Sequence, residues 1–137
     1  MTKARDLMTA GAECVGENET LVDAARKMRD LDVGMLPICG EDNRLKGVLT
    51  DRDIVVRCLA EGGDPATALA GQFGQGKPVT IGADDSIEEA LATMTEHQIR
   101  RLPVIDGHDL VGMLAQADIA RAMPEKATGE TVQNISR

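Results

Sequence analysis

The sequence contains one short unit twice. Residues 14–54 align with residues 80–119 at an offset of 66, which becomes 65 after a polar turn. A change of length in a turn is what a true repeat tolerates best. The agreeing positions include Ala24/Ala90, Met28/Met94, Gly47/Gly112 and Asp53/Asp118. Because a unit of about 50 residues buries too little surface to be stable alone, we expect two copies packed face to face about a pseudo-twofold axis.

Each copy is predicted to run strand, helix, strand, turn, strand, helix. Apolar residues at helical spacing predict a first helix over residues 20–31, and a capping box at Ser86 starts its counterpart. The other predicted elements are hairpins over 35–49 and 102–114, second helices over 51–61 and 117–123, and lead-in helices over 1–9 and 66–73. The predicted fold class is therefore α+β, with two β-α-β-β-α units in one module.

The repeat also predicts the domain boundaries. The first unit with its lead-in helix spans residues 1–63, the second spans 64–123, and a polar tail follows at 124–137. Pro37 and Pro103 fall inside predicted strands. Because proline cannot donate a ladder hydrogen bond, we expect both at a strand start or on a free edge.

The charge of the chain argues against a nucleic-acid partner. Its 15 Lys and Arg face 23 Asp and Glu, a net charge of −8 spread evenly over both halves, whereas phosphate neutralisation needs clustered basic residues. No segment approaches the roughly 18 apolar residues of a membrane span, and no apolar signal-peptide core is present, so we expect a cytoplasmic protein. Phe73 is the single aromatic residue, so a bound base would be clamped by aliphatic side chains and backbone.

The sequence does not predict an enzyme. Catalysis needs a nucleophile or an acid–base pair oriented by partners, and the chain has no Ser-His-Asp order, metal motif or P-loop. His97 ends a predicted helix and His108 lies in a polar turn. The three cysteines match neither a disulfide framework nor a zinc spacing. A zinc site would need folding to bring these residues together, so no metal ligands are predicted.

The strand-to-helix turn after Gly47 has the groups that a nucleotide monophosphate needs. Thr50 and Asp53 lie three residues apart across the turn, so both can face the start of the helix. The helix start suits a phosphate, and a carboxylate accepts from the two hydroxyls of a ribose. Gly47 lets another backbone or a ligand come close. The alternative is that Thr50 or Asp51 caps the helix and Asp53 adds charge to its first turn.

The repeated motifs resemble those of a tandem cystathionine-β-synthase (CBS) domain pair, also called a Bateman module. The resemblance rests on Gly47-Val48-Leu49-Thr50-Asp51-Arg52-Asp53 and on the Leu-Pro-Ile/Val strands at 36–38 and 102–104, and it covers residues 5–123. It implies a stand-alone, non-enzymatic regulatory module with a role in stress response. Such modules often form a flat homodimer. It also implies that an adenosyl nucleotide such as AMP or ATP binds in the clefts between the units.

The family's Gly-x-x-Thr-x-x-Asp pattern carries over fully to the first unit. The resemblance implies that Thr50 contacts phosphate and Asp53 the ribose hydroxyls. In the second unit Gly112 and Asp118 fit, but Ala115 stands where threonine is expected, so a phosphate contact is lost there. Arg100 or Arg101 would supply phosphate charge instead, or else form a solvated pair at a strand start.

A second hypothesis uses two of the three cysteines. Cys14 lies at the first strand and Cys39 at the end of the neighbouring one, and adjacent strands bring Cα atoms within the roughly 4.4–6.8 Å that a disulfide needs. The protein would then be redox- or metal-responsive, with no nucleotide ligand. The alternative is that both are small buried apolar residues, as we expect for Cys58 on a helix face.

Overall fold

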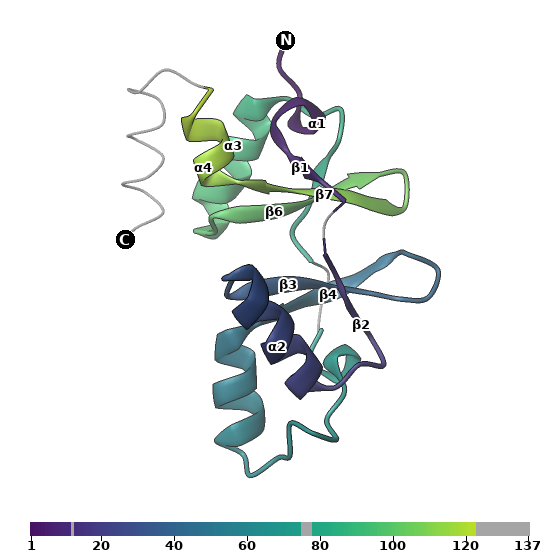
Figure 1. The fold of residues 1–137 in the computed structure, drawn as a ribbon. Coiled ribbons are helices and arrows are strands. Elements are labelled where there is room, and N and C mark those ends of the chain that lie inside the picture. Colours follow the sequence, from purple (N-terminus) through teal and green to yellow (C-terminus); the bar gives the residue numbers. More distant parts are fainter. Residues whose placement is uncertain (12, 75–77, 123–137) are drawn as a thin grey trace. The chain divides into compact units, whose positions relative to one another are not determined.

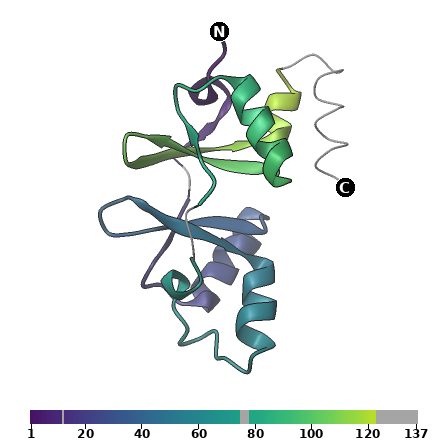
Figure 2. The same ribbon diagram turned by 180° about the vertical axis from the view of Figure 1, so that it is seen from behind.

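The computed structural model describes residues 1–11, 13–74 and 78–122 and has the predicted α+β fold. The chain divides into two compact units (Figures 1 and 2). Glu13–Pro78 form one, which we call the continuous unit. Met1–Ala12 and Val79–Arg137 form the other, which we call the split unit.

The continuous unit is a three-stranded sheet with helices. Its sheet order is β2-β3-β4, in which β2 is parallel to β3 and β3 is antiparallel to β4. Its elements are β2 (Val15–Gly16), α2 (Leu21–Leu31), β3 (Met35–Cys39), β4 (Leu45–Thr50), the π-helix η1 (Asp53–Leu59) and the 3₁₀ turn η2 (Ala70–Gln72).

The split unit repeats this plan and adds one strand. Its sheet order is β1-β7-β6-β5. Its elements are α1 (Ala4–Leu7), β1 (Thr9–Ala10), β5 (Ile81–Gly82), α3 (Ile87–His97), β6 (Arg101–Asp106), β7 (Asp109–Ala115) and α4 (Gln116–Ala120). The hairpin register is the same in both units: Leu36 opposes Leu49 as Leu102 opposes Leu114.

The first helix of each unit begins at a hydroxyl side chain. Thr20 Oγ1 accepts from the Asp23 amide at 3.2 Å, and Ser86 Oγ accepts from the Glu89 amide at 3.1 Å. Each helix then buries one apolar face against its own sheet. The buried core residues of the continuous unit are Val15, Leu21, Ala24, Met28, Leu36, Ile38, Leu49, Ile54, Cys58 and Ala70. Those of the split unit are Ala4, Ile81, Ala83, Ile87, Ala90, Met94, Leu102, Val104, Leu114 and Ile119.

The lead-in segments exchange places, which the sequence did not predict. The N-terminal segment packs on the second repeat: the Ala4 amide donates to the Asp85 carbonyl at 2.9 Å. Residues 66–74 pack on the first repeat, where the Ala70 amide donates to the Glu19 carbonyl at 2.8 Å. Both alanines are fully buried. The predicted boundaries at 63 and 64 follow the repeat in the sequence, whereas the compact units divide the chain after residues 12 and 78.

Several elements are shorter than predicted. The two lead-in helices reduce to α1 and to the single turn η2. In the second helix of the first repeat, i→i+5 bonding replaces i→i+4 bonding, as when the Ala60 amide donates to the Val55 carbonyl at 2.9 Å. Its counterpart α4 ends at Ala120; the predicted end at Met123 and the tail at 124–137 lie outside the described residues.

Both strand prolines lie inside central strands, which corrects the expectation of a strand start or a sheet edge. Pro37 is in β3, between β2 and β4, and Pro103 is in β6, between β5 and β7. The short parallel strands explain why this is tolerated. They pair only from Ile38 and Val104 onward, one residue past each proline. Because neither proline is paired to the parallel strand, the missing N–H interrupts no pairing there.

Ion pairs hold the exchanged N-terminal segment to the split unit. Arg5 Nε donates to Asp84 Oδ1 at 2.9 Å, and Arg5 Nη2 lies 3.4 Å from Asp106 Oδ2. The hydrogen bond from Arg5 lowers the pKa of Asp84, against a smaller opposing effect of desolvation. These pairs are solvent-exposed, so they orient the segment more than they stabilise it.

Candidate functional site

Thr50 and Asp53 meet across the turn from β4 to η1, which we call the first mouth. The Thr50 amide donates to Asp53 Oδ2 at 2.9 Å, and the Asp53 amide donates to Thr50 Oγ1 at 3.1 Å. This reciprocal pair is a capping box, so the structure shows the capping alternative raised for Thr50. The capping role of Asp51 is not observed: its carboxylate accepts from the neighbouring Arg52 amide at 2.8 Å.

The capping contacts leave polar groups available at the first mouth. The Thr50 hydroxyl accepts through one lone pair and keeps its own O–H donor. Asp53 uses Oδ2 for the Thr50 amide, while Oδ1 lies 3.5 Å from Arg57 Nη1. The Asp53 side chain is 23% exposed. A hydroxyl donor and a carboxylate acceptor therefore remain side by side at the surface of the continuous unit.

Gly47 is used by another backbone. A Cβ atom placed on Gly47 would lie 2.8 Å from Gly74 Cα and 3.1 Å from Gly74 C. The structure therefore shows the first of the two roles expected of Gly47, the close approach of a chain segment.

The second mouth, between β7 and α4, differs in chemistry. The Ala115 amide donates to Asp118 Oδ2 at 2.9 Å, but Ala115 has no hydroxyl to return the bond. Asp118 Oδ1 accepts from Arg121 Nη2 at 2.6 Å, and the Asp118 side chain is 11% exposed. Arg101 is exposed and directly opposes Ala115 in the hairpin, which places it beside the missing hydroxyl. Arg100 is exposed as well.

Gly112 mirrors Gly47. It pairs with Ala10 of the exchanged strand β1, and a Cβ atom placed on Gly112 would lie 2.7 Å from the Thr9 carbonyl oxygen. Both glycines of the family pattern thus leave room for the backbone of a lead-in segment to pack against the hairpin.

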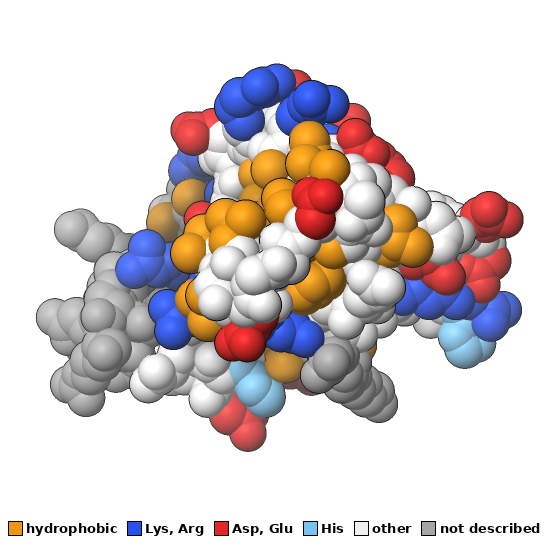
Figure 3. Space-filling view, turned by 90° about the horizontal axis from the view of Figure 1, so that it is seen from below, with side chains coloured by type: hydrophobic (Ala, Val, Ile, Leu, Met, Phe, Trp, Pro, Cys, Tyr) orange, Lys and Arg blue, Asp and Glu red, His pale blue; other side chains and the backbone are white. Residues whose placement is uncertain are grey.

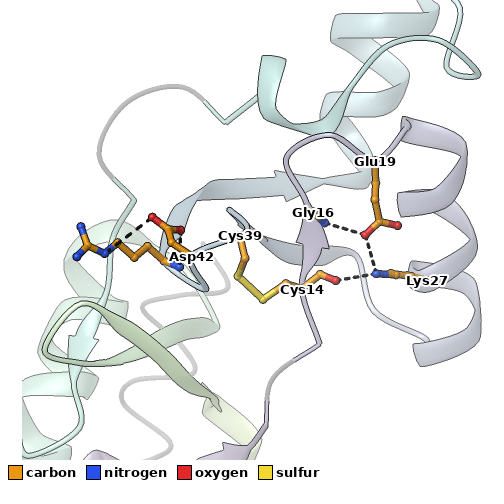
Figure 4. The surroundings of a disulfide bond; sticks show 7 residues. Cys14, Gly16, Glu19, Lys27, Cys39 and Asp42 are labelled. Carbon is orange, nitrogen blue, oxygen red and sulfur yellow. Dashed lines mark hydrogen bonds and ion pairs between the residues drawn. A yellow bond between two sulfur atoms is a disulfide. The ribbon is translucent and has the colours of Figure 1, made fainter.

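Cys14 and Cys39 form a disulfide in the continuous unit (Figure 4), with their Cα atoms 5.9 Å apart. Beside it, Lys27 Nζ donates to the Cys14 carbonyl at 2.8 Å and to Glu19 Oε1 at 3.1 Å. The split unit has Thr80 and Ile105 at the equivalent positions, so the disulfide belongs to one repeat alone.

The remaining candidates are dispersed. Cys58 is a buried free thiol, as expected. His97 ends α3 and His108 lies in the β6–β7 turn. Across residues 1–11, 13–74 and 78–122, no group of three or more His, Cys, Asp or Glu side chains is placed to hold a metal ion.

Near the disulfide, Asp42 accepts from the backbone amide of Arg44, which lowers the pKa of its carboxyl, and Lys46 adds to this effect.

Arg57 and its link to Phe73 were not predicted from the sequence. Arg57 Nη1 donates to the Phe73 carbonyl at 2.9 Å, and Arg57 Cζ lies 5.2 Å from the centroid of the Phe73 ring. Asp53 and Arg57 lie four residues apart on a predicted helix, and this spacing was a signal for the ion pair between them. Nothing in the sequence indicated that Phe73 completes it.

The continuous unit also has an apolar face that was not predicted from the sequence. Val55, Val56 and Leu59 of η1 are 56%, 40% and 50% exposed. Two grooves of about 360 and 320 Å³ run along α2 and η1, sharing Ala25, Arg29 and Ile54 in their lining. Figure 3 shows hydrophobic side chains gathered in the middle of the view with Lys and Arg among their neighbours. None of the helices in the described part of the chain is long and apolar enough to cross a membrane.

Comparison with known protein families and curated proteins gives consistent matches. The CBS domain family model matches residues 4–59 and 71–125. Hypoxic response protein 1 of Mycobacterium tuberculosis (strain H37Rv) is 55% identical over 98% of this chain and 94% of its own length. The CBS domain-containing protein YhcV of Bacillus subtilis (strain 168) is 38% identical over 99% of this chain and 96% of its own.

Solved structures show the same similarity. The crystal structure of Hypoxic Response Protein I with two coordinated zinc ions has a TM-score of 0.84 at 56% identity, covering 90% of this chain and all of that one. The crystal structure of CBSX2 in complex with AMP has a TM-score of 0.77, covering 89% of this chain and 96% of that one. Its identity of 23% makes this second likeness one of fold alone.

The contact between Gly47 and Gly74 yields a stability prediction. Gly47→Ala should destabilise the protein by about 1–3 kcal/mol, because the new methyl group overlaps backbone that cannot rotate away. Urea unfolding measures the change.

The matched control is Gly34→Ala. There the nearest atom to the new methyl is Oδ2 of the exposed Asp51 side chain, at 3.0 Å, which is free to turn aside. Equal losses of stability in the two variants would contradict the assigned role of Gly47.

Proposed function

The chain belongs to the CBS domain family, and from that premise we propose that this regulatory CBS pair senses an adenosyl nucleotide of the AMP or ATP class at the first mouth. The observation that carries the proposal is the Thr50–Asp53 pair. Its capping bonds leave the Thr50 hydroxyl proton and the lone pairs of Asp53 Oδ1 available at a surface position. The proposed role is non-enzymatic.

Each ligand group has a chemical partner. The Thr50 O–H donates to a phosphate oxygen, and Asp53 accepts from the ribose hydroxyls. Arg57, 3.5 Å from Asp53, places a cation at the same mouth. The AMP in the CBSX2 structure belongs to that protein and shows that a chain of this fold holds such a ligand.

We propose that the second mouth is the weaker of the two. Ala115 has no hydroxyl for a phosphate, and Asp118 is more deeply covered than Asp53 and bonded to Arg121. Arg101, opposite Ala115, is the residue that would supply phosphate charge there. Gly112 serves the exchanged strand β1. Nucleotide would therefore occupy the first mouth at lower concentrations.

The nucleotide proposal predicts a thermal shift. AMP or ATP should raise the melting temperature of the protein, and Asp53→Ala should weaken binding about 10- to 150-fold, the loss expected for a charge-assisted hydrogen bond. Differential scanning fluorimetry with a titration of each nucleotide measures both.

Asp118→Ala is the matched control, because it removes the equivalent carboxylate from the second mouth and should leave the tighter binding event unchanged. A melting temperature that no adenine nucleotide moves would end this proposal.

The proposed partner is a second copy of the chain. The exposed Val55 and Leu59 and the grooves beside them form an apolar face of the kind that marks protein contacts. Arg26 and Arg29 line one of these grooves. Because the chain carries a net charge of −8, a second copy offers acidic groups to these arginines.

A dimer that uses this face should dissociate when a charge enters it. Leu59→Asp is expected to shift the sedimentation equilibrium mass from twice the chain mass toward one chain. The new carboxylate replaces an apolar contact and competes with the acidic groups of the second copy for Arg26 and Arg29, which line the same groove. Leu31→Asp is the matched control, since Leu31 is 43% exposed and outside the groove linings. A dimer that withstands both substitutions would place the contact elsewhere.

The disulfide favours a second candidate function, a redox-responsive CBS pair. Cys14, the residue before β2, is joined to Cys39 at the end of β3, and the two lie 25 positions apart in the sequence. Lys27 and Glu19 connect the same place to α2. The zinc ions in the relative's structure belong to that protein.

The redox candidate predicts a change in thiol count. Denatured oxidised protein should titrate one thiol, from Cys58, and reduced protein three. Reduction should also lower the free energy of unfolding by about 3.5 kcal/mol, the value for a loop of this length. Cys58→Ala is the control and should remove one thiol from each count. Three thiols in both states would exclude the candidate.

A further inference from the structure

We propose that Arg57 is a positioning residue that links the state of Asp53 to the segment Phe73–Gly74, and so to the end of the continuous unit. The ligand-dependent part of this inference rests on the proposed nucleotide site. The contact of Arg57 with Asp53 and Phe73 does not rest on that site, because the structure shows it directly.

One guanidinium serves both partners. Arg57 Nη1 lies 3.5 Å from Asp53 Oδ1 and 2.9 Å from the Phe73 carbonyl oxygen, which accepts its hydrogen bond. The cation also stands 5.2 Å from the centroid of the Phe73 ring. A guanidinium is flat and has donors in a fixed fork, so a change in its pairing on one side alters its direction on the other.

The segment that Arg57 holds also lies on the strand leading to the mouth. Gly74 sits on Gly47 of β4 with no room for a side chain between them. β4 ends in Thr50, so the segment Phe73–Gly74 is connected to the first mouth in two ways. Gly74 contacts the strand that carries Thr50, and Phe73 accepts a hydrogen bond from Arg57, which faces Asp53. The strand route is rigid backbone, whereas the Arg57 route depends on charge at Asp53.

The split unit has no such link at the equivalent positions. The repeat places Ala122 where Arg57 stands, and Leu7 where Phe73 stands. Asp118 instead pairs with Arg121, three residues on. The coupling is therefore specific to the unit whose mouth retains the complete Gly-x-x-Thr-x-x-Asp pattern.

The seven-residue π-helix coincides with this link. Asp53 is the first residue of η1 and Arg57 lies in its last turn, whereas the α4 helix of the split unit is α-helical. π-helical segments are rare and occur often at functional sites. In this chain the π-helix carries both members of the ion pair.

The first test needs no ligand. Asp53→Asn removes the charge that Arg57 faces but keeps an oxygen for the Thr50 amide. In the full chain it should speed hydrogen exchange of the Gln72 and Phe73 amides about tenfold, as expected when a charge-assisted hydrogen bond is loosened. In an Arg57→Met background the same change should have no further effect. Additive effects of the two substitutions would overturn the inference.

The matched control is Asp118→Asn in the split unit. It makes the same change at the second helix cap, where position 122 is alanine, and should leave exchange in α1 and β1 unaltered. If α1 responds as strongly as η2, the effect is a general loosening by the cap and the inference is wrong. If Arg57→Met does not fold, Phe73→Leu takes its place. This change puts at position 73 the leucine that stands at the equivalent position 7, and so removes the aromatic ring beside Arg57. It should weaken the response of hydrogen exchange to Asp53→Asn.

The second test adds AMP. Saturating AMP should change exchange at residues 72–74 in the wild type. This difference should vanish in Arg57→Met, measured at an AMP concentration raised until the thermal shift of that variant is itself saturated, so that weaker binding alone does not explain the loss. Binding without any response at 72–74 in the wild type overturns the coupling and leaves the proposed function standing. If no nucleotide binds, the proposed function fails, and the double-variant test decides the coupling by itself.

Discussion

The close approach of each lead-in segment to a glycine of the central hairpin is the contact on which both compact units depend. Gly74 lies on Gly47, and the Thr9 carbonyl lies against Gly112. Because each lead-in also places a buried alanine in the core that it joins, the segment is part of that core. The two glycines of the family pattern, Gly47 and Gly112, therefore lie where the backbone of a lead-in segment needs the space of a side chain.

The two units share a hairpin and differ where the second helix starts. The first mouth has a hydroxyl and a carboxylate that cap each other, followed by a π-helix with Arg57. The second has a carboxylate alone, covered by Arg121, followed by an α-helix. The two repeats share their framework, whereas the chemistry of their mouths differs. Function is thus expected to be asymmetric in a molecule whose framework is repeated.

Sequence patterns predicted what depends on local chemistry. The α+β fold, the helix starts at Thr20 and Ser86 and the two hairpins follow from hydroxyl caps and alternating apolar residues. The exchange of the lead-ins does not follow, because a hydrophobic pattern shows that Ala4 and Ala70 are buried but not in which core. The π-helix was missed because Ile54 and Cys58 fit an α-helical face as well.

The candidate site was predictable to a similar extent. The residues of the first mouth follow from their spacing across one turn, and the neighbouring strands of Cys14 and Cys39 made their contact foreseeable. Phe73 was foreseeable only as a lone aromatic residue in an aliphatic chain. Its role depends on a fold-back that brings residue 73 to residue 57, and sequence spacing contains no information on such a contact.

The exchanged lead-ins bear on the history of the chain. In a protein with a single repeat, this arrangement would need the lead-in segment of a second molecule beside the hairpin glycine. Two such proteins could each pack the lead-in segment of the other beside their own hairpin glycine, as in a domain-swapped dimer. Joining the two genes then turns a swap between molecules into one within a molecule, and the exchange seen here is what that event would leave behind.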